Sequence, residues 1–189
     1  MWDVRPTSKI VFVITPDTED WTWVLERPCA ECGFDSNTVD REGVSALVRA
    51  NAATWCDLLS AGVRLRTRPG PDRWSTLEYA CHVRDVLRVF DERLVLMLTE
   101  EDPTYAEWDQ DRAAVEGRYN EQDPSLVATD LSVAAERVAT RLDRLPDGAI
   151  RRGGKRSDGT RFTVETLSRY FAHEVVHHLH DVGVPAAGK

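Results

Sequence analysis

The stretch STLEYACHVRDVLRVFDERLVLML, residues 75–98, decides how this chain folds. It opens with Ser75 and, three residues later, Glu78, the S-x-x-E pattern of a capping box, in which each side chain accepts a hydrogen bond from the other residue's backbone N–H. The residues that follow place six apolar side chains within an arc of about 100° on a helix. These are Val83, Val86, Leu87, Phe90, Leu94 and Met97. The stretch therefore predicts an amphipathic helix with one face in a hydrophobic core.

Three further segments combine a capping residue with an apolar stripe. They lie at residues 40–65, 123–145 and 163–182, with Asp40, Asp123 and Thr163 as the expected N-caps. No segment has the pattern of a central strand. We therefore predict an all-α fold, a four-helix bundle over residues 40–189 that follows an irregular N-terminal extension, residues 1–39.

Length and charge restrict the class of protein. A chain of 189 residues is long enough for one domain with a full core. The net charge of −8 argues against binding to nucleic acid or to an anionic membrane. Acidic residues are frequent between residues 100 and 123, where a solvated surface is the expected interpretation. No apolar run resembles a membrane span or a signal peptide, so a cytoplasmic location is expected.

The sequence HEVVHHLHDVG, residues 173–183, matches the zinc-protease pattern H-E-x-x-H. In that pattern the two histidines bind one zinc ion from successive helical turns, and the glutamate between them is the general base. A protease also needs a third protein ligand, which in these families lies downstream. After Asp181 the chain contains no Asp, Glu, His or Cys. The protease interpretation is therefore rejected.

A third histidine is available upstream. His82 lies beside the apolar stripe of the helix predicted at residues 75–98, and a bundle can bring it close to His173 and His177. Three imidazole nitrogens with open positions for water or substrate form a catalytic type of zinc or nickel site. The alternative is that His173 and His177 are surface histidines, because they lie opposite the apolar face of their own helix. On the same reasoning His178 points toward the apolar side and is not expected to bind metal.

These motifs resemble the DinB/YfiT-like metalloproteins, whose bundle is also found in mycothiol-dependent maleylpyruvate isomerases. The matching pieces are the segment WSTLE at residues 74–78, His82 one turn later, and His173-x-x-x-His177. The resemblance covers about residues 40–182 and implies a four-helix bundle with a divalent metal on His82, His173 and His177. His180 stands where many members carry glutamine.

The resemblance implies a thiol-dependent S-transferase or isomerase that uses zinc or nickel and a thiol cosubstrate such as mycothiol. Its partners would be a small-molecule thiol and an electrophilic substrate, and a homodimer is compatible with the sequence. Glu174 and His180 are candidate acid/base groups, and the basic segment with Arg151, Arg152 and Arg156 could hold a carboxylate of the thiol or substrate. A metal-dependent hydrolase and a non-catalytic metal-binding protein are the alternatives.

The extension contains the pattern C-x-x-C at Cys29 and Cys32, which is half of a zinc knuckle. A complete site needs two further ligands. Cys56 and Cys81 lie on predicted helices and are expected to be buried core residues. For Cys29 and Cys32 three interpretations stay open: a structural role or free thiols, a redox-active pair, or a second metal site.

Overall fold

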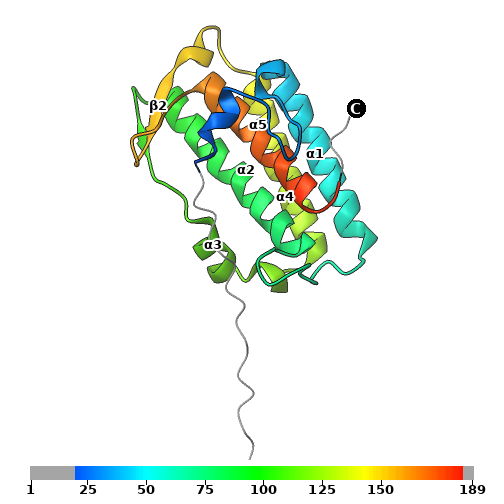
Figure 1. The fold of residues 1–189 in the computed structure, drawn as a ribbon. Coiled ribbons are helices and arrows are strands. Elements are labelled where there is room, and N and C mark those ends of the chain that lie inside the picture. Colours follow the sequence, from blue (N-terminus) through cyan, green and yellow to red (C-terminus); the bar gives the residue numbers. More distant parts are fainter. Residues whose placement is uncertain (1–19, 185–189) are drawn as a thin grey trace, which may run out of the picture.

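The structure is a computed structural model that describes residues 20–184 of the chain. Four long helices lie side by side in a bundle (Figure 1), and a short helix accompanies them. The long helices are α1 (Arg41–Ala61), α2 (Thr76–Thr99), α4 (Pro124–Asp143) and α5 (Val164–Asp181), and the short one is α3 (Gln110–Glu116). Helices α1 and α2 each pack against both α4 and α5, so the bundle encloses one core.

The predicted helix starts are confirmed. The side chains of Asp40, Asp123 and Thr163 each accept a hydrogen bond from a backbone N–H in the first turn of their helix. Ser75 and Glu78 form the complete capping box at the start of α2. These caps act within four residues of sequence, so the local pattern is sufficient to locate them. The first helix ends earlier than predicted, because Gly62 adopts a left-handed conformation with φ of 70°.

The apolar stripe predicted on α2 is the centre of the core. All six of its residues are buried, and they join buried side chains of the other long helices. Trp55 of α1, Leu131 of α4 and Phe171 of α5 are almost completely enclosed. Phe90 stacks on Phe171, with ring centroids 4.6 Å apart, which links α2 to the middle of α5. Packing of this stripe therefore fixes how α2 and α5 face each other.

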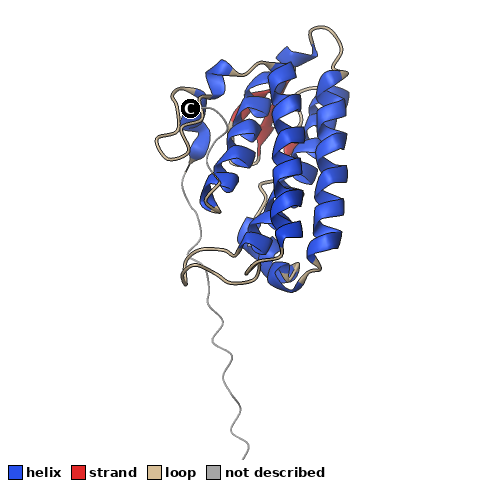
Figure 2. Cartoon of the chain, turned by 90° about the vertical axis from the view of Figure 1, so that its right-hand side faces the viewer, coloured by secondary structure: helices blue, strands red, loops and turns tan. Residues whose placement is uncertain are grey.

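A small sheet makes the all-α description approximate. Strands β1 (Thr104–Tyr105), β2 (Gly153–Arg156) and β3 (Arg161–Thr163) form it in the order β1-β2-β3, with β1 parallel and β3 antiparallel to β2. Figure 2 shows the strands, in red, behind the upper part of the helices. Gly154 packs closely there, since a β-carbon on it would lie 2.9 Å from the Met97 side chain. No strand pattern is visible in the sequence because the strands are only two to four residues long, and β2, with the sequence GGKR, lacks the β-branched and aromatic residues that favour strands.

The described part of the N-terminal extension lies against α5. It contains two short 3₁₀ helices, η1 (Trp21–Leu25) and η2 (Ser36–Thr38). Between them a turn carries the C-x-x-C pattern, closed by a hydrogen bond from the Gly33 N–H to the Cys29 carbonyl and by another from the Cys29 N–H to the Phe34 carbonyl. The predicted extension also includes residues 1–19, which lie outside the described residues.

Two further 3₁₀ helices, η3 (Tyr119–Glu121) and η4 (Ala149–Arg151), complete the connections. Among the helices of residues 20–184, none is both long enough and apolar enough to cross a bilayer.

Candidate metal centre

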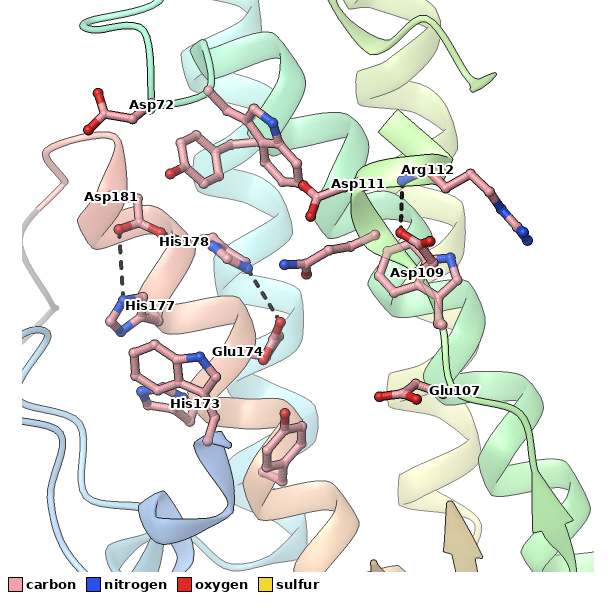
Figure 3. A pocket seen from close by; sticks show the side chains of 16 residues that line it. Asp72, Glu107, Asp109, Asp111, Arg112, His173, Glu174, His177, His178 and Asp181 are labelled. Atoms are coloured by element: carbon pink, nitrogen blue, oxygen red, sulfur yellow. Dashed lines mark hydrogen bonds and ion pairs between the residues drawn. The ribbon is translucent and has the colours of Figure 1, made fainter. Parts of the chain in front are cut away.

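A cavity of 790 Å³ opens between α5 and the segment that contains α3. Figure 3 shows His173, Glu174, His177 and His178 along α5 on one side and Glu107, Asp109 and Asp111 on the other. The lining also includes five aromatic side chains, Trp21, Trp74, Tyr79, Trp108 and Tyr170, and the polar side chains of Asp72, Gln110, Arg112 and Asp181. The cavity therefore combines acidic groups, imidazoles and large aromatic surfaces, a composition suited to a polar ligand that also has apolar faces.

Two potential metal ligands of α5, Glu174 and His178, line this cavity. His82 of α2 is fully buried beside them, and one ligand atom from each of the three residues lies within 4.8 Å of the others. The two Nε2 atoms of His82 and His178 are 3.0 Å apart. One carboxylate oxygen of Glu174 lies 3.8 Å from Nε2 of His82 and 3.4 Å from Nε2 of His178. Ligand atoms around a tetrahedral zinc ion are roughly 3.3 Å apart, given bond lengths of about 2.0–2.1 Å. The three atoms are thus spaced to hold one divalent cation.

The electrostatics of the three groups are strongly coupled. Burial, followed by the charge of His178, lowers the pKa of His82 to about 4. Burial also opposes charging of His178, but hydrogen bonds with Asp181 and Glu174 outweigh it and raise the pKa of His178 to about 9. Burial would raise the pKa of Glu174, yet the two histidines hold it well below its usual range. Without a metal, positive charge on His178 therefore balances the buried carboxylate.

Neighbouring side chains orient the two imidazoles. Asp181 lies 2.9 Å from Nδ1 of His178, which directs Nε2 of that ring toward Glu174 and His82. Trp108 stacks on His82, with ring centroids 5.3 Å apart and planes inclined by only 14°. Trp74 contacts the same imidazole at 5.1 Å. The His82 ring is fully buried, and its Nδ1 has no hydrogen-bond partner among the described residues.

The structure divides the predicted trio of His82, His173 and His177 between two groups. No set of ligand atoms within 4.8 Å of one another in residues 20–184 contains His82 together with either of the other two histidines. His173 and His177 instead meet Cys29 and Cys32, and all four side chains are buried. The N-terminal segment thus covers the face of α5 that helical periodicity alone would leave in solvent.

The other predicted site residues have separate locations. Glu174 lines the cavity, whereas the exposed His180 is not part of its lining. Arg152 donates hydrogen bonds to the backbone carbonyls of Met97 and Glu100 at the end of α2.

Arg156 pairs with Asp158 at 2.6 Å, and Arg151 is exposed on η4. Neither these two arginines nor Arg152 lines the cavity. The basic segment thus begins on η4 and continues into the β2–β3 hairpin.

The acidic segment at residues 100–123 is more than a solvated surface, since three of its carboxylates line the cavity. His178 is the main residue that the sequence reasoning excluded. A signal for it was present, because HEVVHH contains two overlapping i, i+4 pairs, His173 with His177 and Glu174 with His178. His178 lies on the core side of its helix and His82 flanks the core stripe of α2, so the two could have been expected to meet.

Comparison with known proteins agrees with this architecture. Residues 45–182 match the DinB superfamily. The chain belongs to this superfamily. A solved structure with a similar fold is that of YfiT from Bacillus subtilis, described as a probable metal-dependent hydrolase with an unusual four-helix bundle topology. The two share 22% sequence identity with a TM-score of 0.65, over 84% of this chain and 89% of the other. No curated protein matches the chain.

Proposed function

We propose that this DinB-superfamily protein is a metal-dependent S-transferase, with a divalent ion on His82, Glu174 and His178. The convergence of these three donors carries the proposal, since two of them, Glu174 and His178, also line the cavity. Two imidazoles and one carboxylate suit zinc or nickel, and three protein ligands leave a position for an exogenous group. In this assignment Glu174 is a ligand rather than an acid/base group.

Such an ion, when bound, would coordinate a thiol as its thiolate, which is the nucleophilic form. The chain's own residues would position the reactants. Asp181 accepts a hydrogen bond from Nδ1 of His178 and so keeps Nε2 free for the ion. Trp108 and Trp74 fix the plane of His82. In the transfer, the thiol proton would pass to solvent and the sulfur would form a bond to an electrophilic carbon. The bond from that carbon to the leaving group would break, and the leaving group would depart with the bonding electrons.

The cavity lining favours a sugar-bearing thiol of the mycothiol type. Carboxylates only accept hydrogen bonds when ionised, so Glu107, Asp109 and Asp111 suit a ligand with many hydroxyl donors. Aromatic rings such as Trp21 and Trp108 offer flat apolar surfaces for the C–H faces of a sugar. Carboxylates outnumber the single arginine of the lining, Arg112, so an acidic thiol would be repelled on balance. This argument does not use the arginines of the β2–β3 hairpin.

A sharp test combines metal analysis with turnover. The His82→Gln and His178→Ala proteins should each lose one bound metal ion per chain, and conjugation of mycothiol to an electrophile should fall at least 100-fold. His180→Ala is the matched control, because His180 lies on the same helix but outside the cavity, and it should keep both metal and activity. Full activity in His178→Ala would overturn the proposal.

Hydrolysis is the second candidate, because the structurally similar YfiT is described as a probable metal-dependent hydrolase. The same open position could hold a water molecule, and a bound metal ion would lower the pKa of that water. Metal-dependent cleavage of ester or amide substrates without any thiol, lost in His178→Ala, would favour this candidate over S-transfer.

A further inference from the structure

We propose that Cys29, Cys32, His173 and His177 form a second metal site, a structural zinc site that joins the N-terminal segment to α5. The site shares no ligand with the cluster of His82, Glu174 and His178. It also requires no catalytic activity of the protein.

The first argument is the donor set. Two cysteines spaced C-x-x-C and two histidines spaced H-x-x-x-H are the ligands of Cys₂His₂ zinc sites. The pairs are far apart in sequence, and Cys29 and His177 differ by 148 in residue number. The fold nevertheless brings one ligand atom from each of the four residues within 4.8 Å of the others.

The second argument is the spacing of the atoms. Sγ of Cys29 lies 3.7 Å from Nδ1 of His177. Around tetrahedral zinc, with Zn–S of about 2.3 Å and Zn–N of about 2.0 Å, sulfur and nitrogen ligands are roughly 3.5 Å apart. The observed distance is long for a hydrogen bond from a thiol but appropriate for two atoms that share one ion.

The third argument is the burial of all four residues, together with the absence of hydrogen-bond partners at His173. The exposed fractions of Cys29, Cys32, His173 and His177 are 2%, 6%, 2% and 8%. Both ring nitrogens of His173 are buried and have no hydrogen-bond partner among the described residues. A buried polar atom without a partner costs roughly 1–3 kcal/mol. A metal ion would satisfy one of the two nitrogens, and two thiolates would balance its charge in the buried site.

The fourth argument is that carboxylates lie near the second ring nitrogen of His177. Nε2 of His177 faces away from Cys29 and lies 3.6 Å from a carboxylate oxygen of Glu31 and 3.8 Å from one of Asp181. A metal-binding histidine commonly has a carboxylate near its second nitrogen, which orients the ring. Glu31 lies between the two cysteines, so the same turn supplies both ligands and this support. After Cys32 the turn closes through Gly33, whose φ of 74° favours glycine.

Mixed thiolate and imidazole ligands select zinc over magnesium, calcium or manganese. The consequence for the fold is local. Trp21 contacts both histidines, with ring centroids 5.6 Å from His173 and 5.0 Å from His177, and it also lines the large cavity. Zinc at the second site would therefore fix one wall of that cavity.

Elemental analysis of the purified full-length protein tests the site directly. The double variant Cys29→Ser/Cys32→Ser should contain one zinc ion per chain less than the wild type. Cys56→Ser is the matched control, since Cys56 lies on α1 outside the cluster, and it should retain the wild-type zinc content. Unchanged zinc in the double variant would overturn the proposal.

Two measurements on intact protein remain decisive if the double variant does not fold. The His82→Gln protein loaded with cobalt should show the charge-transfer absorption of cobalt–thiolate bonds and the visible bands of tetrahedral cobalt. A spectrum without thiolate bands would overturn the site. In freshly isolated protein, mass spectrometry should find both cysteines reduced and shielded from alkylation until a chelator is added. A disulfide between Cys29 and Cys32 would identify a redox pair instead.

Discussion

Replacement of Glu78 by glutamine should destabilise the protein by about 2 kcal/mol at pH 7. The Glu78 side chain is only 5% exposed and accepts three hydrogen bonds. They come from the Ser75 N–H at 2.8 Å and from two nitrogens of Arg68 at 2.9 and 2.5 Å. Glutamine keeps one acceptor oxygen but cannot receive the paired bonds of a guanidinium.

The magnitude follows from the environment of each partner. Hydrogen bonds to a charged group contribute about 1.5–3 kcal/mol. The Arg68 side chain is 28% exposed, so water can partly replace the lost carboxylate and limit the loss of folding free energy. For a chain of this size, a loss of about 2 kcal/mol corresponds to a decrease of roughly 4–8 °C in Tm.

The pH dependence supplies a second check. Burial opposes ionisation of Glu78, but Arg68 and Ser75 outweigh it and lower its pKa. Stability from a carboxyl group with a lowered pKa is fully present above the unfolded value of about 4.3 and is lost as the pH falls through the folded value. The difference between wild type and Glu78→Gln should therefore be full at pH 7 and shrink progressively below about pH 4.3.

Urea and thermal unfolding of four proteins would measure these effects: wild type, Glu78→Gln, Arg68→Ala and the double variant. The double-mutant cycle isolates the Glu78–Arg68 interaction. Glu165→Gln serves as a control, since Glu165 is in the first turn of α5 but its side chain is 45% exposed, and its effect should be below about 0.5 kcal/mol. An equally small effect of Glu78→Gln at pH 7, or a loss that does not shrink in acid, would refute the reasoning.

Three other substitutions test how the bundle holds the site, and urea unfolding measures each of them. Asn51→Ala should lose about 1–2 kcal/mol, because the buried Asn51 amide donates a 2.7 Å hydrogen bond from α1 to the Val175 carbonyl of α5. Tyr119→Phe should lose a similar amount by removing a 2.6 Å hydrogen bond to Asp85, and an unchanged midpoint would contradict this. Gly154→Ala should cost about 1–3 kcal/mol, since its β-carbon would meet a buried methionine side chain at 2.9 Å, and a neutral result would show that this side chain moves freely.

The sequence contains most of the information on the long helices because their signals are local. The caps at Asp40, Ser75, Asp123 and Thr163 act within one turn, and the apolar stripe of α2 repeats with the helical period. Local patterns also indicated a bundle and a metal-binding class of protein. They did not indicate the small sheet, whose strands are very short and whose β1 pairs with β2 about fifty residues away in the chain.

The arrangement of potential metal ligands depended on contacts that helical periodicity does not describe. His173 and His177 lie opposite the apolar face of α5, which favoured a surface or cavity location. In the structure the C-x-x-C turn covers that face, so a non-local contact changes the environment of both histidines. His178 was set aside because it points toward the core, yet His82 approaches the same boundary from α2 at 3.0 Å. The angle of each side chain was predictable, but the identity of the segment facing it was not.

Two successive residues of α5 belong to different clusters, and this occurs twice, at 173–174 and at 177–178. Side chains of neighbouring residues on a helix point in directions about 100° apart, whereas side chains four residues apart point in nearly the same direction. His173 and His177 therefore face one cluster, and Glu174 and His178 face the other. The angle between the two clusters around the axis of α5 is therefore set by the geometry of the helix. A substitution at one of these positions affects its own cluster first. Insertion of a single residue between 174 and 177 would rotate the following histidines by about 100° and dismantle both clusters at once. The length of this segment is thus under a stricter constraint than the identity of the two valines inside it.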